Sequence, residues 1–207
     1  GLAKELGFNN KVSGVFPGGG GYDLEVFKKY KKPLSQRNLI LIKGYHHWAG
    51  RALVVLEALT TIIDEVKNFK IYVYSAHDEV VEKINQINQE FDLEIEYSSR
   101  YHQISHEELL EKFCSSLIAI GNSISDGIPN TLLETIILGG FPIQSNPGNV
   151  TEDYIENGKN GYLISNPESP KEIAQHISNA IANKDLLVQA YKTNITLADK
   201  LDCTIVK

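Results

Sequence analysis

The segment SDGIPNTLLE, residues 125–134, places two carboxylates, Asp126 and Glu134, on either side of an expected helix start. An apolar run at 116–121 precedes it and ends at a glycine, which is typical of a buried strand. Pro129 and Asn130 signal the start of the next helix, with Asn130 expected as its N-cap. A strand, a tight loop and a helix N-terminus bind phosphate well, because free N–H groups and the positive end of the helix dipole face the ligand. We therefore expect this segment to hold a nucleotide-linked small molecule.

The two acids are suited to different tasks. Glu134 lies about one turn into the helix, at the edge of its apolar stripe, where it can accept hydrogen bonds from sugar or ribose hydroxyls. Asp126 precedes a glycine, a place where aspartate also occurs as a plain turn residue. The backbone amides of Asn130, Thr131 and Leu132 would hold a phosphate whatever their side chains. The binding residues expected at this corner are Ile128, Pro129, Asn130, Thr131 and Leu132.

Composition narrows the class of protein. The chain has 207 residues, 42% hydrophobic and 22% charged, which is ordinary for a soluble globular protein. Its net charge of −6 and lack of a long basic run argue against a nucleic-acid partner. Cys114 and Cys203 form neither a disulfide framework nor a metal-binding spacing, which favours a reducing, cytoplasmic compartment. No apolar run reaches the roughly 18 residues of a spanning helix. The chain begins at Gly1 and contains no methionine, so we expect a fragment.

Strands and helices alternate from Asn38 onward. This alternation implies right-handed βαβ crossovers and an α/β, Rossmann-like parallel sheet of about six strands, with helices on both faces. In such sheets the ligand lies at the carboxyl ends of the strands. The expected strands are 38–43, 69–74, 93–97, 117–121, 141–145 and 161–164. The expected helices are 50–65, 78–91, 105–114, 131–138, 151–157, 169–183 and 185–201. Ser105 and Glu108 are expected to form a capping box at the start of the helix 105–114.

The first 37 residues have a weaker pattern. A strand is expected at 11–15 and a short helix at 23–30. The glycine run at 18–21 is read as a flexible junction, because no Lys-Ser or Lys-Thr pair follows it as in a phosphate-binding loop.

Four motifs in a fixed order resemble the C-terminal, donor-binding half of GT-B retaining glycosyltransferases, the family called group 1 or family 4. They are the linker-like segment 15–27, the two-carboxylate signature 126–134, the segment 140–143, and the run 148–163, which contains Gly148, Glu152, Gly158 and Gly161. The resemblance runs from about residue 11 to about residue 182. It implies residues 1–37 as the end of an N-terminal domain and linker, 38–183 as the nucleotide-sugar-binding domain, and 184–207 as a helical extension.

The resemblance implies transfer of a glycosyl group, with retention, from a nucleoside-diphosphate sugar to a saccharide or lipid-linked acceptor, as in polysaccharide or glycoconjugate synthesis. Asp126 and Glu134 become the catalytic residues, with Asp126 on the donor sugar and Glu134 on the ribose. Arg100, Tyr101 and Ile104 follow a strand end, where family members hold the nucleobase largely through the main chain. Neither a cofactor nor a metal is expected.

Two departures from the family pattern matter. The first signature carboxylate is Asp126 rather than glutamate, so its side chain is one methylene shorter. The loop that begins at Gly44 lacks the family's arginine and lysine. We expect Arg51 to bind the diphosphate in their place, because a planar guanidinium suits two phosphates, with Lys43 as its rival.

Other polar residues of this loop are poor candidates for metal chemistry. His46 and His47 are adjacent and have no clustered carboxylate or cysteine in the sequence. Trp48, the single tryptophan, is expected to anchor the loop.

Partners follow from the resemblance. A preceding domain would bind the acceptor and carry any membrane association, placing the enzyme at the cytoplasmic face of the membrane. Alone, this half should bind a nucleoside diphosphate weakly and transfer nothing. Two alternatives stay open: a sugar-nucleotide epimerase, which would need His46 or His47 to titrate with activity, and a non-catalytic nucleotide-binding domain, which would need only the phosphate site.

Overall fold

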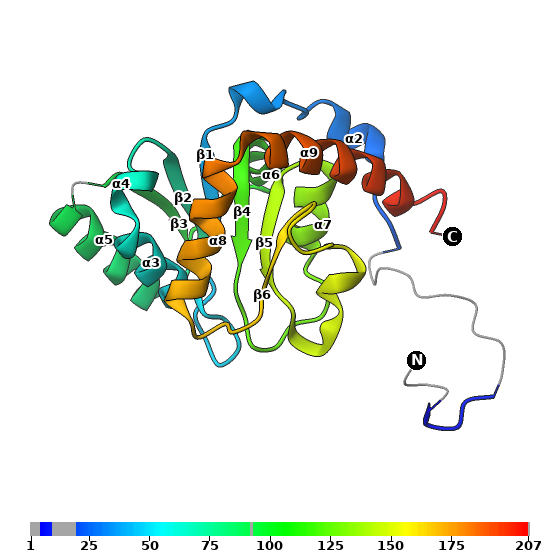
Figure 1. Cartoon of the computed structure of the whole chain (residues 1–207), viewed down its shortest axis with the longest axis horizontal. Coiled ribbons are helices and arrows are strands. Elements are labelled where there is room, and N and C mark those ends of the chain that lie inside the picture. The colour runs from blue at the N-terminus through cyan, green and yellow to red at the C-terminus, as the bar shows by residue number, and fades with distance from the viewer. Residues whose placement is uncertain (1–4, 10–19, 92, 207) are drawn as a thin grey trace.

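The computed structural model describes residues 5–9, 20–91 and 93–206. Helices surround a parallel sheet in this part of the chain (Figure 1). The strand expected at 11–15, the glycines at 18 and 19, and the start of the linker-like segment lie outside the described residues.

The sheet has six strands in the order β3-β2-β1-β4-β5-β6, and every neighbouring pair is parallel. This is the doubly wound order, in which the direction of strand addition reverses between β1 and β4. The expected fold class is therefore confirmed. The strands are β1 (Leu39–Lys43), β2 (Lys70–Ala76), β3 (Ile95–Ser99), β4 (Ser116–Gly121), β5 (Phe141–Ser145) and β6 (Tyr162–Ile164).

Short connections join these strands to helices. The α-helices are α2 (Leu24–Lys28), α3 (Ala52–Thr61), α4 (Ile63–Val66), α5 (Asp78–Phe91), α6 (His106–Ser115), α7 (Asn130–Ile137), α8 (Pro170–Ala182) and α9 (Lys184–Ala198). Among the described residues there are also four short 3-10 turns: η1 (Leu34–Gln36), η2 (Pro147–Asn149), η3 (Thr151–Asp153) and η4 (Asp199–Leu201).

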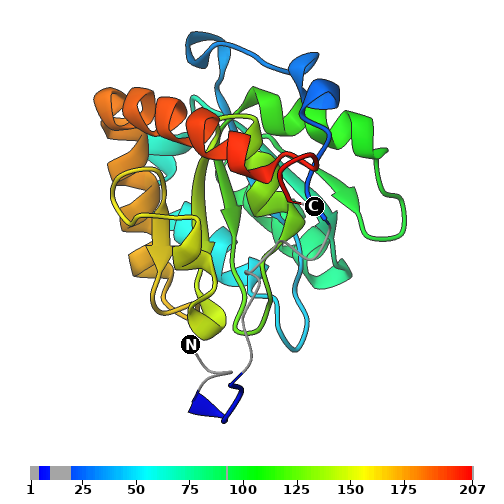
Figure 2. The same ribbon diagram turned by 90° about the vertical axis from the view of Figure 1, so that its right-hand side faces the viewer.

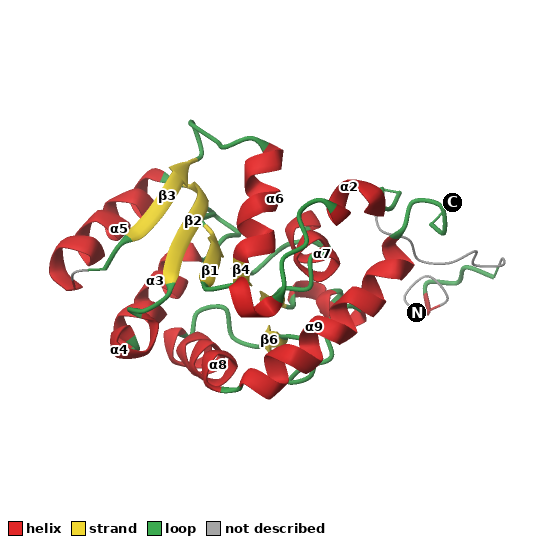
Figure 3. Cartoon of the chain, turned by 90° about the horizontal axis from the view of Figure 1, so that it is seen from above, coloured by secondary structure: helices red, strands yellow, loops and turns green. Residues whose placement is uncertain are grey.

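The two faces of the sheet bury separate apolar cores, because alternate side chains of a strand point to opposite faces. Helices α3, α5 and α8 pack on one face. Helices α6 and α7 pack on the other. Seen from above in Figure 3, the sheet runs between α3 and α8 on one side and α6 on the other. Helix α9 joins both cores, since Leu187 belongs to the first and Ala198 to the second.

The structure departs from the expected helices most clearly at three places. The helix expected at 50–65 is two helices, because Ile62 leaves helical geometry with φ −129° and ψ 31°. The helix expected at 151–157 is only the 3-10 turn η3. Asn130 is the first residue of α7 rather than its N-cap; Pro129 takes that place and makes no side-chain cap. The capping box of Ser105 and Glu108 at α6 is confirmed.

The segment before α2 lies beside the C-terminal end of the chain (Figure 2). The Tyr22 amide donates to the Leu201 carbonyl at 2.8 Å, and the Cys203 amide donates to the Tyr22 carbonyl at 2.9 Å. Gly21, with φ +89°, has no room for a side chain, because a Cβ there would lie 2.7 Å from Cys203 Cα. This crossing fixes Tyr22 on the side of the molecule that carries α7.

Candidate functional site

A polar cleft of about 300 Å³ opens at the carboxyl ends of β1, β4 and β5. It lies at the point where the strand order reverses, which is where open α/β sheets bind ligands. Two loops form its walls, one after β1 and one after β4. Its lining residues are Lys43, Tyr45, Ala49, Gly50, Asn122, Ser123, Ser125, Asp126 and Gln144.

The guanidinium of Arg51 holds the loop after β1 in shape. Its Nη1 lies 3.1 Å from the carbonyl oxygen of His47 and 2.9 Å from that of Gly50. Its Nε is bonded to the carboxylate of Glu168. The side chain expected to grip a diphosphate is thus already bonded within the protein. Its role in ligand binding stays a prediction.

Main-chain bonds tie the same loop to the loop after β4. The Arg51 amide donates to the Asn122 carbonyl at 2.9 Å, and the Ile124 amide donates to the Ala49 carbonyl at 2.8 Å. Gly50 is required at this contact, because a Cβ there would lie 2.2 Å from the Tyr45 carbonyl oxygen. The cleft therefore has firmly connected walls.

Lys43 and Asp126 face each other across the cleft. The Lys43 Nζ lies 3.4 Å from Asp126 Oδ2, and both side chains stay partly exposed. Gly44 continues the end of β1: its amide donates to the Tyr74 carbonyl at 2.8 Å, and a Cβ there would lie 2.6 Å from Ala76 Cα. Of the two residues considered for binding the diphosphate, Lys43 lines this cleft and Arg51 does not.

The first turn of α7 presents free backbone donors. Among the described residues, the amides of Asn130 and Thr131 have no acceptor, whereas the Leu132 amide donates to the Pro129 carbonyl at 3.0 Å. Two of the three amides expected to bind phosphate are therefore available. The Tyr22 hydroxyl lies 3.3 Å from Asn130 Oδ1 and braces the side chain of the first helical residue.

Glu134 is buried one turn further along α7, with 5% of its surface exposed. Its Oε1 lies 2.8 Å from Nε2 of His106, the first residue of α6. Burial raises the pKa of the Glu134 carboxyl, and the hydrogen bond and charge of His106 oppose that rise. The carboxylate is thus oriented by a neighbouring helix rather than solvated at the helix edge.

Tyr74 on β2 belongs to the core beneath α6 and α7. Its buried hydroxyl lies beside Thr131, and the charges of both Glu134 and Asp126 act on it. Burial raises the pKa of Tyr74 far above its usual range; a hydrogen bond with Thr131 opposes this rise, and the charges of Glu134 and Asp126 add to it. Burial and the charge of Glu134 also raise the pKa of Tyr22 to about 12.

The residues expected near the nucleobase lie in the loop between β3 and α6. Arg100 Nη1 lies 2.7 Å from His77 Nε2, and its guanidinium carbon lies 4.8 Å from the centre of the Tyr45 ring. Ile104 packs with the core formed by α6 and α7, on the side of Glu134. Tyr101 is exposed, so the structure does not bring it to the cleft lining.

The loop after β1 also corrects an expectation. Trp48 does not anchor it, because 69% of that side chain is exposed and Arg51 does the anchoring instead. His46 Nε2 lies 4.0 Å from Glu79 of α5. Within residues 5–9, 20–91 and 93–206, no three histidine, cysteine or acidic side chains gather as a metal site would require. No helix of the same residues is long and apolar enough to cross a bilayer.

Three neighbours of the signature acids were not singled out from the sequence: Tyr22, Tyr74 and His106. Each comes from a different element, so no local spacing links it to 126–134. The capping box at α6 was the one available signal, because it fixed the start of the helix whose first residue is His106.

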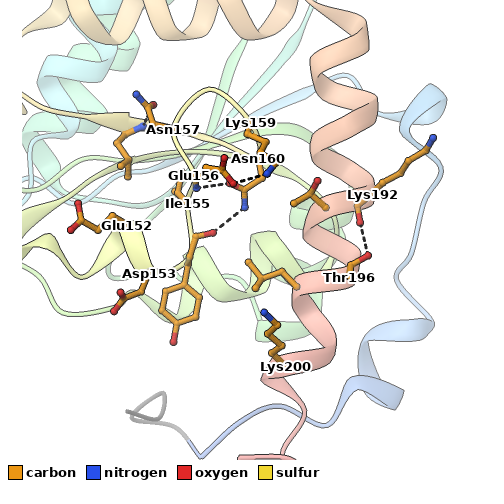
Figure 4. A pocket seen from close by; sticks show the side chains of 14 residues that line it. Glu152, Asp153, Ile155, Glu156, Asn157, Lys159, Asn160, Lys192, Thr196 and Lys200 are labelled. Atoms are coloured by element: carbon orange, nitrogen blue, oxygen red, sulfur yellow. Dashed lines mark hydrogen bonds and ion pairs between the residues drawn. The ribbon is translucent and has the colours of Figure 1, made fainter. Parts of the chain in front are cut away.

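A second, wider groove lies between the segment 152–163 and α9, with a volume of about 910 Å³. Figure 4 shows Glu152 and Asp153 on one side of it and, opposite, Lys192 on α9 and Lys200 on η4. Its buried amide is fully bonded: Asn160 Oδ1 accepts from the Glu156 amide at 2.7 Å, and its Nδ2 donates to the Tyr154 carbonyl at 2.9 Å. This groove lies away from the signature acids.

Comparisons with known proteins agree with this architecture. A model of the family described as glycosyl transferases group 1 matches residues 24–196. Comparison with curated protein sequences gives no match.

Solved structures share the fold at low sequence identity. The C-terminal domain of LpcC, a glycosyl transferase group 1 family protein from Francisella tularensis, is 18% identical with a TM-score of 0.73, covering 87% of this chain and 97% of that one. HepE of Anabaena, solved with UDP-glucose, is 13% identical with a TM-score of 0.72, covering 98% of this chain and 57% of that one. A glycosyltransferase from Rickettsia africae is 19% identical with a TM-score of 0.66, covering 90% and 52%.

The chain spans 34% of the length of TarM from S. aureus and 52% of the Rickettsia enzyme. The family model, in contrast, covers most of the present chain. This chain belongs to the group 1 family of glycosyl transferases.

Proposed function

We propose that this chain binds a nucleoside-diphosphate sugar and forms the donor half of a retaining glycosyltransferase. One observation carries the proposal: the amides of Asn130 and Thr131 at the start of α7 have no acceptor among the described residues, and along the chain they lie between Asp126, the partner of Lys43, and the buried Glu134. A diphosphate needs donors and positive charge at one place, and a sugar or ribose needs carboxylate acceptors beside it. Membership of the group 1 family supports the same function.

The phosphates would be held at the tip of α7. The amides of Asn130 and Thr131 act as preorganised donors, which need no rearrangement as charge develops on the leaving diphosphate. Lys43 adds a cation within the same cleft. Arg51 contributes indirectly, because its bonds keep the loop after β1 closed against the loop after β4.

The ribose would be held by Glu134. His106 occupies Oε1, which leaves Oε2 of the carboxylate for ribose hydroxyls. The loop that contains Arg100 and Ile104 borders the same region and would hold the nucleobase. Asp126, paired with Lys43, would contact the donor sugar.

The whole enzyme would transfer the sugar with retention to a saccharide or lipid-linked acceptor, in polysaccharide or glycoconjugate synthesis. We assign the acceptor to a domain outside residues 38–183 and any membrane contact to that domain. The same proposal includes a cytoplasmic location and activity without a metal. It also assigns residues 1–37 to the end of an N-terminal domain and its linker, and residues 184–207 to a helical extension. HepE was solved with UDP and with UDP-glucose, which makes UDP the first nucleotide to test.

Calorimetric titration of the 207-residue chain with UDP, ADP and GDP tests the proposal. We expect one of the three to bind with a Kd of roughly 0.1–1 mM, because this half supplies phosphate and ribose contacts without a closing domain. The matching nucleoside monophosphate should bind more weakly, since it lacks the distal phosphate. Failure of all three diphosphates to bind would contradict the proposal, and sugar transfer by this chain alone would contradict the assignment of the acceptor elsewhere.

A further inference from the structure

The first turn of α7 begins without a side-chain cap. Pro129 stands at the N-cap position and makes no side-chain hydrogen bond to the helix. A serine or aspartate there would bond to the amide of the second or third helical residue, and without such a bond the first turn of a helix frays more readily. The missing cap leaves free the amides of Asn130 and Thr131, which the proposed nucleotide site needs. Another contact must therefore hold this turn in place.

Two tyrosine hydroxyls hold the side chains of the same two residues. The Tyr22 hydroxyl lies 3.3 Å from Asn130 Oδ1 and 3.5 Å from the Asn130 carbonyl oxygen, so both acceptors within its reach belong to one residue. The Tyr74 hydroxyl, from β2, forms a hydrogen bond with the side chain of Thr131. Neither contact uses a backbone N–H group. The turn is thus held from outside the helix while its amides stay available to a ligand.

The C-terminal end of the chain places Tyr22. The Tyr22 amide donates to the Leu201 carbonyl at 2.8 Å, and its carbonyl accepts from the Cys203 amide at 2.9 Å. The ring packs edge-on against Phe27, with 5.7 Å between the ring centres. Burial and the charge of Glu134 raise the pKa of the phenol to about 12, so it keeps its proton at neutral pH and can donate. Backbone and ring are therefore both fixed.

We propose that Tyr22 is a positioning residue for the nucleotide site: held by residues 201–203, it keeps the first turn of α7 closed, so that the amides of Asn130 and Thr131 are ready for a phosphate. This inference rests on the nucleotide site proposed above. It adds that the two ends of the described chain, which carry no phosphate donor of that site, determine how tightly the site binds. Tyr74 supports Thr131 from the side of the core.

Tyr22→Phe is the decisive variant. It removes the hydroxyl and keeps the ring that packs on Phe27, so Tm should stay close to that of the wild-type chain. The amides of Leu132 and Leu133 bond to the Pro129 carbonyl at 3.0 and 3.3 Å and report whether the turn is closed. In the chain without ligand, their exchange with solvent, measured by NMR, should become at least about twofold faster, as loss of one neutral hydrogen bond implies.

Tyr162→Phe is the matched control. Tyr162 lies on β6, is partly buried like Tyr22, stacks on His176 and packs with the core on the other face of the sheet. Removal of its hydroxyl should leave exchange at Leu132 and Leu133 unchanged. An equal effect of both substitutions would show that loss of any phenol loosens α7, which would overturn the specific role of Tyr22.

A double-mutant cycle tests the contact itself. Asn130→Ala removes the acceptor Oδ1 and keeps the backbone amide, so it should speed exchange at Leu132 and Leu133 as Tyr22→Phe does. Because the two substitutions remove one shared contact, the double variant should exchange little faster than either single variant. Full additivity would show that Tyr22 and Asn130 act independently and would overturn the inference.

Gly21→Ala tests the support from the C-terminal end without a change to the phenol. A Cβ at Gly21 would lie 2.7 Å from Cys203 Cα, and its φ of +89° disfavours residues other than glycine. The variant should move Tyr22 away from Asn130 and speed the same exchange. Unchanged exchange would overturn the role given to residues 201–203.

The ligand readout is the ratio of the Kd of a nucleoside monophosphate to the Kd of its diphosphate, measured by calorimetry for UMP and UDP, AMP and ADP, and GMP and GDP. The first turn of α7 would hold the distal phosphate, so this ratio reports on the turn. For the nucleotide that binds, Tyr22→Phe should lower the ratio at least about twofold, because a smaller fraction of molecules has the turn closed. Tyr162→Phe should leave the ratio unchanged.

A smaller change of the exchange rate or of the ratio in Tyr22→Phe overturns the inference while leaving the nucleotide site intact. Absence of diphosphate binding by the wild-type chain contradicts the proposed function instead. The exchange measurement needs no ligand, so it still decides whether Tyr22 holds the turn.

Discussion

The strand-end cleft and the groove beside α9 differ in a way that separates a binding site from a surface hollow. The groove is about three times larger, at about 910 Å³ against about 300 Å³. Its buried amide, Asn160, is fully bonded within the protein, and its lysine at 159 pairs with Glu156 at 2.7 Å. The cleft instead includes Asn122, whose Oδ1 is buried without a hydrogen-bond partner among the described residues.

Pocket volume is therefore a poor indicator of the ligand site in this protein. Polar groups without hydrogen-bond partners are a better one. Helix α7, which follows the cleft residue Asp126 in the chain, adds two amides without acceptors among the described residues, and Glu134 adds a carboxylate with one oxygen in contact with His106. Such groups are costly to keep in a free protein and become useful when a ligand meets them. The groove therefore serves as the internal control for the cleft.

The largest expected effect comes from Glu134→Gln. The amide cannot accept from ribose hydroxyls as strongly as a carboxylate does, so the Kd of the bound nucleoside diphosphate should rise at least tenfold, about 1.4 kcal/mol. Calorimetry on the folded variant measures it. An unchanged Kd would remove Glu134 from the site and with it the main distinction between the cleft and the groove.

Lys43→Ala and Arg51→Ala test whether Lys43 binds ligand while Arg51 stabilises the loop after β1. Lys43→Ala should weaken diphosphate binding by about three- to tenfold, with little loss of stability, because its pair with Asp126 is partly exposed. Arg51→Ala should instead lower the free energy of unfolding by about 1–3 kcal/mol, because loop carbonyls and Glu168 lose their donor. Urea unfolding and calorimetry separate the two. The reverse pattern would make Arg51 the diphosphate ligand.

The pH dependence of stability tests the burial of Glu134. Because burial raises its pKa, the folded state holds this proton more tightly than the unfolded chain does. The stability contributed by the group is therefore present at acid pH and is lost as pH rises from the ordinary carboxyl pKa through the raised one. Glu134→Gln should raise Tm at neutral pH, and the difference should shrink toward about pH 4. A lower Tm at neutral pH would show that the contact with His106 outweighs burial.

The smallest effect is expected in the groove. Lys200→Ala removes one of its cations, yet diphosphate and sugar-conjugate binding should stay within experimental error of the wild-type chain. Calorimetry under the conditions used for Lys43→Ala provides the matched comparison. A loss as large as that of Lys43→Ala would place ligand in the groove.

The sequence predicted the fold well because strand and helix periods are local. The helix at 78–91 and the strand at 141–145 have the expected bounds, and the parallel order follows from their alternation. The expected helices were wrong where the backbone leaves α-helical geometry although the sequence pattern continues. Ile62 breaks an apolar helical run, and η3 is a 3-10 turn in a segment that reads as helix.

The site was predictable only in part. The start of α7 and its two acids follow from spacing along one segment. The bonds of Arg51 to Glu168 and of Glu134 to His106 join segments far apart in sequence. The burial of the Asn122 oxygen without a partner likewise depends on the folded structure. No local sequence pattern shows such contacts. The sequence therefore predicted a ligand-binding role for Arg51 without showing that its guanidinium bonds to loop carbonyls.

Backbone amide NMR of the chain, titrated with UDP, ADP and GDP, would locate the diphosphate on the protein residue by residue. The diphosphate that binds should shift the signals of Asn130 and Thr131 most, followed by residues of the cleft, while the signals of 152–163 and α9 stay in place. Shifts centred on 152–163 and α9, with Asn130 and Thr131 unmoved, would contradict it.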